Sequence, residues 1–316
     1  MKTRLNIYFT FLLLSYSTAI YSQINRANDW KRYRKEIILQ VGAAQFLGDL
    51  GGQNKIGTDY SPVDLEFSLT KPAISIAYRY KFFKNFNIHN SFNYLLVAGD
   101  DKLTTEPFRN NRNLNFKSNI FELATRLELS FFSKKSGHRY GIAKTLGRRS
   151  KTYSYEIIGF VGVGAFYYNP KGKNPVNGAW MPLRPLHTEG QGLPGGPKQY
   201  SKFSISIPMG VAYRLTLQKK WSLGFEINYR KTFTDYIDDV STVYYDKFEL
   251  QQAYGSNSVI MSDPSKGVIP GATSPDGLGN SAQRGDLQKD SYMGVQITVG
   301  YFLAPKKSRA RLRSKF

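Results

Sequence analysis

Residues 203–236 read FSISIPMGVAYRLTLQKKWSLGFEINYRKTFTDY. Large apolar side chains alternate there with small, polar or charged ones, in two runs separated by Lys219 and Lys220. Because successive side chains of a strand leave opposite faces, this pattern predicts a β-hairpin. Each strand covers about 14 residues, or roughly 45 Å, whereas soluble strands usually run roughly 5–6 residues. The length favours a barrel whose apolar face meets lipid over a soluble sheet that buries the same face in a core.

The first 22 residues have the features of a secretory signal. Lys2 and Arg4 precede a short apolar run at residues 7–14, and small residues lead to Ser22-Gln23. We expect cleavage there, because this order of basic, apolar and small residues is typical of signal peptides. The apolar run is too short to cross a bilayer as a helix. A buried N-terminal strand is the alternative interpretation.

The composition narrows the possible partners. The chain has 44 Lys and Arg against 23 Asp and Glu, a net charge of +21, and no Cys. Such a basic protein suggests nucleic acid, anionic lipid or an acidic partner, and the predicted export argues against nucleic acid. Without Cys, stability must come from sheet closure and packing. The 22 Tyr and 21 Phe fit the aromatic girdles of an outer-membrane barrel, although a soluble all-β protein is also compatible with them.

Six further segments show strand alternation. They are residues 36–47, 73–82, 86–98, 119–132, 153–168 and 292–303. Together with the hairpin they predict an all-β fold, an eight-stranded antiparallel up-and-down transmembrane β-barrel with long extracellular loops. The facing of residues 153–168 is ambiguous, because both of its faces are apolar and three glycines interrupt it, which indicates a bend or a crowded interior.

The connections between these segments predict the orientation. Those after the first, third, fifth and seventh strands are long, and those after the second and sixth are short. Outer-membrane barrels have short periplasmic turns, so we expect both termini in the periplasm. The long, basic connection at residues 133–151 breaks this pattern. We divide the chain into a signal peptide (1–22), a periplasmic leader (23–35), the barrel (36–304) and a basic tail (305–316).

The inward face of the predicted strands carries equal numbers of acids and bases. They are Glu36, Glu122, Glu128, Glu156 and Glu226, with Arg79, Lys81, Arg126, Arg214 and Arg230. An eight-stranded barrel has an interior that side chains just fill, so paired charges would plug it. This predicts a lumen charge network and argues against a general porin. A narrow ion path is the alternative.

Enzymatic signals are absent from the sequence, and we predict no catalytic residue, cofactor or metal. The histidines lack ligand spacing and a triad order, so we interpret them as unconnected polar residues: His89, His138 and His187. An acidic group lies in TDYIDDVS and either binds a divalent cation or forms turns at a strand end: Asp235, Asp238 and Asp239. The sequence GQGLPGG at residues 190–196 lacks the Lys of a phosphate loop and predicts a flexible loop tip.

Two basic segments are candidates for partner binding, and the predicted topology places both in the periplasm. They contain Arg139, Lys144, Arg148, Arg149 and Lys151, and then Lys306, Lys307 and Arg309. One interpretation is a docking surface for a periplasmic partner. The other is a solvated face that touches anionic lipid headgroups.

Several phrases resemble a known family. They are GAAQFLGDLG (42–51), SLTKPAISIAYRYK (68–81), GVGAFYYNPKG (162–172), LRPLHTEGQG (183–192) and RKTFTDYIDDVSTVYYD (230–246). They resemble the PorG-like outer-membrane barrels of the Bacteroidota type IX secretion system, over nearly the whole mature chain. The basic tail departs from the family pattern, which leaves open a secretion-system member or a paralogue.

The resemblance implies a non-enzymatic outer-membrane barrel that anchors or assembles the periplasmic ring of the lipoprotein PorK and its partner PorN, in protein secretion and gliding. It supplies no catalytic or mapped contact residues. Two other classes remain open: a structural or adhesive barrel that uses the loop at residues 235–291 outside the cell, and a barrel enzyme that acts on lipid or peptide at the outer surface.

Overall fold

The structure is a computed structural model of the chain. It describes residues 29–50, 67–136, 153–217, 220–241, 243–269, 272, 283–285 and 288–303. The predicted signal peptide, most of the basic connection and the basic tail lie outside the described residues.

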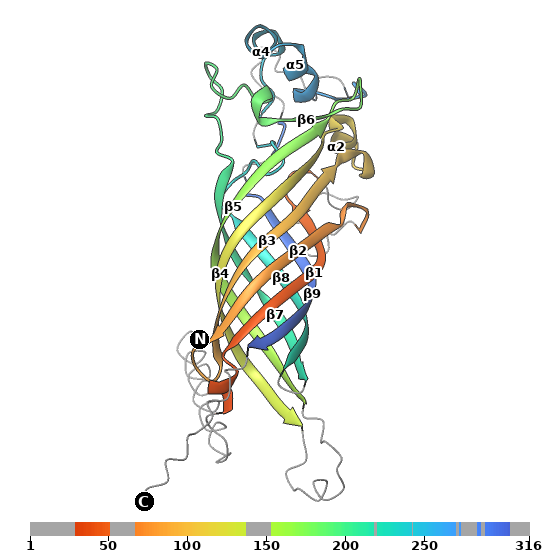
Figure 1. Cartoon of the computed structure of the whole chain (residues 1–316). Helices are drawn as coiled ribbons and strands as arrows, with labels where there is room; N and C mark the ends of the chain where they lie inside the picture. Colours follow the sequence, from red (N-terminus) through yellow and green to blue (C-terminus); the bar gives the residue numbers. More distant parts are fainter. Residues whose placement is uncertain are drawn as a thin grey trace, which may run out of the picture.

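Eight long strands form a closed antiparallel barrel (Figure 1). They are β1 (Lys35–Leu47), β2 (Lys71–Lys81), β3 (Phe86–Asp100), β4 (Asn115–Ser136), β5 (Tyr153–Lys173), β7 (Phe203–Leu217), β8 (Trp221–Thr232) and β9 (Ser291–Leu303). Each strand pairs with the next of these eight along the chain, and β9 pairs with β1 to close the ring. A short strand, β6 (Trp180–Pro182), adds to the upper end of β5. The predicted eight-stranded fold is confirmed.

The register fixes the width of the barrel. Following paired residues from Gly164 through Ala124, Ser91 and onward around the ring returns to β5 at Ser154, ten residues before the start. This stagger requires tilted strands, and eight such strands leave room only for side chains. A Cβ added at Gly300 would clash with the Glu36 carboxylate and the Ser222 hydroxyl, which shows how crowded the interior is.

Two strands are longer than the alternation predicts. β4 extends the predicted segment 119–132 by four residues at each end, and β5 extends 153–168 by five residues. The extensions carry Asn and Lys on the outer face, so a search for apolar alternation ends too early. A bulge between Ser130 and Phe132 also shifts the register of β4 against β5. The facing of β5 is resolved: Ile158, Phe160, Phe166 and Tyr168 point into the barrel.

The long connections contain short helices that the sequence analysis does not predict. They contain η5 (Asp101–Leu103), α2 (Pro107–Arg112), η6 (Arg184–Leu186), α4 (Lys247–Tyr254) and α5 (Ser256–Ser262). The Asp246 carboxylate caps α4 by accepting from the N–H groups of Phe248 and Glu249. Two further short helices are η2 (Asp29–Arg32) and η4 (Phe67–Leu69). Within the described ranges, no helix is both long and apolar enough to cross a membrane.

The helices α2, α4 and α5 gather at one end of the barrel, with β6 (Figure 1). We call this end the cap, and it comprises the described parts of residues 48–50, 101–114, 174–202 and 233–290. At the opposite rim, the first residue of β1 lies beside the last residue of β9, Lys35 against Leu303. Ser136 of β4 lies beside Tyr153 of β5 at the same rim. The first residue of β1, the last residue of β9 and the two strand ends that flank residues 137–152 therefore lie at the rim away from the cap.

Candidate functional site

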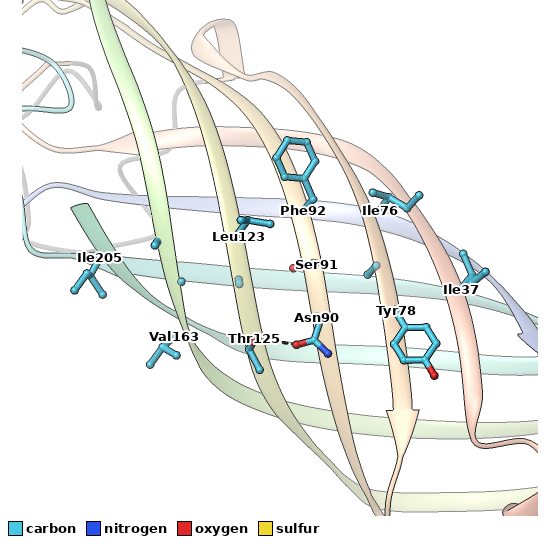
Figure 2. A pocket seen from close by; sticks show the side chains of 14 residues that line it. Ile37, Ile76, Tyr78, Asn90, Ser91, Phe92, Leu123, Thr125, Val163 and Ile205 are labelled. Carbon is cyan, nitrogen blue, oxygen red and sulfur yellow. Dashed lines mark hydrogen bonds between the residues drawn. The ribbon is translucent and has the colours of Figure 1, made fainter. Parts of the chain in front are cut away.

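The outer wall of the barrel is an apolar surface. Ile76, Leu123 and Val163 are 55%, 66% and 63% exposed, and many outward side chains resemble them. Figure 2 shows such side chains projecting around a shallow hollow on the wall across β1 to β5 and β7. The Thr125 hydroxyl donates to the Asn90 amide oxygen at 2.8 Å, so these two polar groups on the wall partner each other. An exposed apolar area this extensive is typical of a surface that contacts lipid or a partner.

Aromatic rings border this apolar wall on both sides. Toward the cap, the rings of Tyr94, Phe121, Tyr167 and Phe203 follow one another across four strands, with centroids 5.2, 6.5 and 5.3 Å apart. Toward the other rim lie Phe132, Tyr155, Tyr213, Trp221 and Tyr301. Phe132 lies eleven positions after Phe121 in β4, and the bulge takes up one of them, so the girdles lie about 26 Å apart at a tilt of ~40°. The spacing matches the apolar band of a membrane barrel, about 25 Å tall.

The lower lumen is filled by buried ion pairs. Arg79 lies between two carboxylates, with Nη1 at 2.9 Å from Glu36 and Nε at 2.6 Å from Glu128. Arg214 also reaches Glu36, at 3.1 Å, and pairs with Glu156. All five side chains are less than a tenth exposed. The β1, β2, β4, β5 and β7 strands are thereby tied together through the lumen.

A second group of ion pairs continues toward the cap. Arg126 binds Glu226 with both terminal nitrogens at 2.6 Å, a bidentate geometry, and its Nε lies 3.2 Å from Glu128. Arg230 pairs with Glu122 at 2.8 Å. Seven of the nine predicted lumen residues thus form one chain of ion pairs, and Asn228 links it to the Arg230–Glu122 pair by contacting both Arg230 and Glu226. We call these nine residues the charge ladder. The tenth inward charge, Lys81, lies nearer the rim with Nζ 3.9 Å from Glu156.

One histidine belongs to this ladder, so the interpretation of His89 as unconnected was wrong. His89 is completely buried, and its Nδ1 lies 2.9 Å from Glu128 Oε1. The alternation along residues 86–98 was the available sequence signal, because it places His89 on the inward face; the structure adds that Arg126 lies opposite. His187 lies in the cap, where its ring stacks on Tyr254 with centroids 4.0 Å apart. His138 lies outside the described residues.

Above the ladder the lumen becomes apolar. The Tyr292 hydroxyl lies 3.2 Å from Glu122, and its ring belongs to a buried cluster. Strand residues in this cluster are Ala44, Phe46, Ala73, Leu95, Val97, Phe116, Ile120, Phe166 and Tyr168, and cap residues are Leu50, Leu114, Leu183, Tyr200, Ile237, Val240 and Met261. The cap therefore shares a core with the barrel and seals its mouth.

Two of the quoted sequence phrases meet inside the cap. The hydroxyl groups of Thr188 and Tyr200 both donate to the Asp239 carboxylate at 2.5 Å. Glu189 accepts from the Ser241 N–H at 2.9 Å and pairs with Arg284 at 3.0 Å. TEGQG and DYIDDVS thus form one buried network, and the prediction of a flexible tip at residues 190–196 was wrong for its buried first residues. Gly190 needs its positive φ of 70° for this turn.

The acidic group of the cap makes backbone turns. Asp238 accepts from the Val240 N–H at 3.0 Å, and Asp290 accepts from the Ile237 N–H at 2.8 Å. Asp235 accepts from the Ser241 hydroxyl at 2.5 Å. In the part of the chain that the structure describes, no group of three or more His, Cys, Asp or Glu residues has the geometry to hold a metal ion. The contacts support the turn interpretation over the cation interpretation.

Burial raises the pKa of three cap carboxyls. The pKa of Asp239 rises to about 6, although Arg284 and the two hydroxyl donors oppose the rise. Burial, and then repulsion from Asp49, raises the pKa of Asp238 well above its ordinary range. Burial and then Asp238 raise the pKa of Asp290 in the same way. Ionising this group costs the folded cap free energy.

The predicted docking residues Arg139, Lys144, Arg148, Arg149, Lys151, Lys306, Lys307 and Arg309 all lie outside the described residues.

Comparisons with known proteins give distant matches. The model of a family described as "Domain of unknown function (DUF6089)" matches residues 6–179. No curated protein matches the sequence.

Among solved structures, Neisserial surface protein A has a TM-score of 0.33 and 7% identity, covering 85% of this chain and 97% of its own. Ail of Yersinia pestis, with the heparin analogue sucrose octasulfate, has a TM-score of 0.34, 9% identity and coverages of 85% and 99%. A major outer membrane protein from Thermus thermophilus has a TM-score of 0.34, 10% identity and coverages of 85% and 99%. No conclusion about activity or partners follows from matches this distant.

We predict that the lumen pairs stabilise the barrel only as pairs. Arg126→Met leaves Glu226 buried without its partner and should cost about 3–5 kcal/mol of unfolding free energy. Arg126→Met combined with Glu226→Leu should recover most of this loss. Denaturant titration of detergent-folded protein, read from the mobility shift of folded and unfolded bands on gels, measures the difference. Lys81→Met, near the rim, is the control with a smaller expected cost. Equal losses in the single and double variants would contradict the prediction.

We also predict that the cap loses stability as pH rises. The pKa of Asp239 moves from an ordinary 3.8 to about 6 on folding, so its protonated form favours the folded cap below pH 4. That contribution declines between about pH 4 and pH 6 and is absent above. Amide hydrogen exchange at Ile237 and Val240, corrected for intrinsic rates, should show less protection at pH 7.5 than at pH 5. Asp238→Asn should weaken this dependence, and protection that increases with pH would refute it.

Proposed function

This chain belongs to the DUF6089 family, and we propose that it is a non-enzymatic outer-membrane barrel that anchors a periplasmic ring of the type IX secretion machinery. The observation that carries the membrane part is the apolar outer wall between two aromatic girdles, on a barrel with closed edges. Water does not stabilise such a wall, whereas the hydrocarbon of a bilayer does.

The filled lumen supports a structural role. The charge ladder occupies the lower lumen, and the shared core of strands and cap occupies the upper lumen. The ionisable groups of the ladder are engaged with one another rather than aimed at a solvent-filled cleft. A barrel of this kind supplies a rigid body in the membrane, with its working surfaces at the two ends.

The rim away from the cap supports the anchoring role. The connection at 137–152 and the segment at 304–316 both continue from strands that end at this rim. These two segments contain eleven Lys and Arg and no Asp or Glu. Two unbalanced basic segments from one rim are suited to an acidic partner on the periplasmic side. The resemblance to PorG-like barrels supports the ring lipoprotein as that partner.

The cap supports a second candidate, a surface barrel that binds outside the cell. Phe108 of α2, Phe248 of α4 and Val268 are 64%, 69% and 72% exposed. Exposed apolar side chains on a rigid support are one feature of interaction surfaces. For such a barrel, the cap rather than the basic rim would bind the partner.

We predict that the protein does not form a large pore. Reconstituted in planar bilayers, it should give no stable conductance of nanosiemens size, because ion pairs and packed rings fill the lumen. A porin measured in the same bilayers is the positive control. Steady open channels of that size would refute the sealed lumen.

We predict that the basic connection holds the ring. When the chain is pulled down from detergent-solubilised membranes, the ring lipoprotein should co-purify. Arg148→Glu with Arg149→Glu should reduce its recovery roughly fivefold to tenfold, if each exposed charge contributes up to about 1 kcal/mol. Lys102→Glu with Lys198→Glu is the matched control, because both lysines are exposed in the cap. Unchanged recovery in the first variant returns these arginines to the solvated-face interpretation. Loss in the control alone favours the cap.

A further inference from the structure

Three lysines gather on the outer wall where β4 and β5 rise above the upper aromatic girdle. Lys117 of β4 lies directly opposite Lys171 of β5, and Lys173 follows on the same face of β5. Like charges placed opposite each other across two strands repel, so a Lys–Lys pair destabilises the sheet unless an anion lies between them. The arrangement therefore indicates a missing counter-charge.

The lysine ion pairs of the described residues involve other lysines. Lysines that form ion pairs in the described residues are Lys81 at the lumen rim, and Lys247 and Lys289 in the cap. The three wall lysines are not among them. Nearby side chains are two amides and one carboxylate: Asn115 accepts from the Lys173 N–H at 2.8 Å, and Asn119 accepts from the Tyr94 hydroxyl at 3.2 Å. Asp100 of β3, which pairs with Asn115 on the same face, accepts from the Lys102 N–H at 3.0 Å and caps η5. Among the described residues of this part of the wall, three lysines outnumber one carboxylate, so the local charge is positive.

An aromatic ring fixes one of the lysines. The Lys117 Nζ lies 3.9 Å from the centroid of the Trp180 ring, a cation–π contact. The short strand β6 holds Trp180 beside Lys173 by backbone pairing. The ring restrains the ammonium while leaving hydrogen-bond donors for an anion. Trp is also the residue that favours the interface between hydrocarbon and headgroups.

The depth of the cluster matches lipid headgroups. Lys117 lies four positions before Phe121 of the girdle, and Lys171 lies four positions after Tyr167. At ~3.4 Å per residue and ~40° tilt, the lysines begin about 10 Å beyond the girdle. The headgroup layer is roughly 5–8 Å thick on each side of the hydrocarbon, and lysine stems reach back toward it along apolar surface. Headgroup phosphates are therefore within reach of this cluster.

We infer that Lys117, Lys171 and Lys173, with Trp180, bind the phosphorylated headgroup of a lipid in the outer leaflet. Lys acts as a point charge toward phosphate, and three of them spread over two strands suit a headgroup with more than one phosphate. This inference rests on the proposed outer-membrane location, but not on the ring partner.

The test compares two triple variants of the full chain purified in detergent. The first is Lys117→Gln, Lys171→Gln and Lys173→Gln. The control is Lys102→Gln, Lys198→Gln and Lys220→Gln, which removes the same charge from exposed lysines away from the cluster. Native mass spectrometry measures binding of diphosphorylated lipid A, of phosphate-free lipid A, and of lipid A in competition with inorganic phosphate. The gel mobility shift shows that each variant is folded.

The wild-type chain and the control should bind diphosphorylated lipid A equally, within about twofold. The wall variant should bind it ~100-fold more weakly, if each lysine contributes about 1 kcal/mol. Phosphate-free lipid A should bind the wild-type chain as weakly as diphosphorylated lipid A binds the wall variant. Equal binding by both triple variants, or equal binding of both lipids, overturns the inference. Displacement of the lipid by millimolar inorganic phosphate overturns the lipid source in favour of a free anion.

The two proposals fail in different ways. If the wall variant loses lipid but still recovers the ring, the lipid site and the anchor are independent and both stand. If the wild-type chain fractionates with soluble proteins, the outer-membrane proposal fails and the lipid inference fails with it. If it fractionates with the outer membrane and shows no preference for phosphorylated lipid, only the inference fails.

Discussion

The narrowness of a closed eight-stranded barrel is the constraint on which the rest depends. Every inward side chain must be accommodated by other inward side chains, because the ring leaves little space for solvent. Arg126 and Glu226 are 100 residues apart in sequence, and Arg230 and Glu122 are 108 apart, yet each pair is buried. Removing one member would strand the other charge in a low dielectric. The ion pairs therefore favour one register of the closed sheet, the register in which every inward charge meets its partner.

The alternation of inward and outward side chains along each strand was enough to predict which charged residues face the lumen. The alternation along six of the strands predicts which side chains face inward, and the nine ladder residues are buried in the structure. Which acid meets which base depends on the stagger of the ring. Glu36 lies opposite its neighbour Arg79 in the β1–β2 register, but it also meets Arg214 from the far side. Only the closed barrel reveals the second contact, and it also reveals His89.

The cap was less predictable, because its order does not come from periodicity. α2 and α4 are shorter than an isolated helix needs for stability, and a carboxylate caps the first turn of each. The phrases TEGQG and DYIDDVS lie about 50 residues apart, and their contact through Thr188 and Asp239 is a tertiary one. These phrases carried much of the family resemblance. In the structure these phrases hold the cap together through buried contacts, so a family-specific sequence motif does not by itself mark a binding site.

The ladder also explains where the net charge of +21 acts. Five acids and five bases cancel inside the lumen, so the whole excess of positive charge lies outside it. Residues 137–152 and 304–316 carry eleven Lys and Arg, and three further lysines lie on the wall at Lys117, Lys171 and Lys173. A membrane protein places uncompensated cations at low cost only at the two interfaces, where headgroups and aqueous partners supply anions. Because the lumen charges balance one another, the remaining positive charge is available for contacts at the two faces of the membrane.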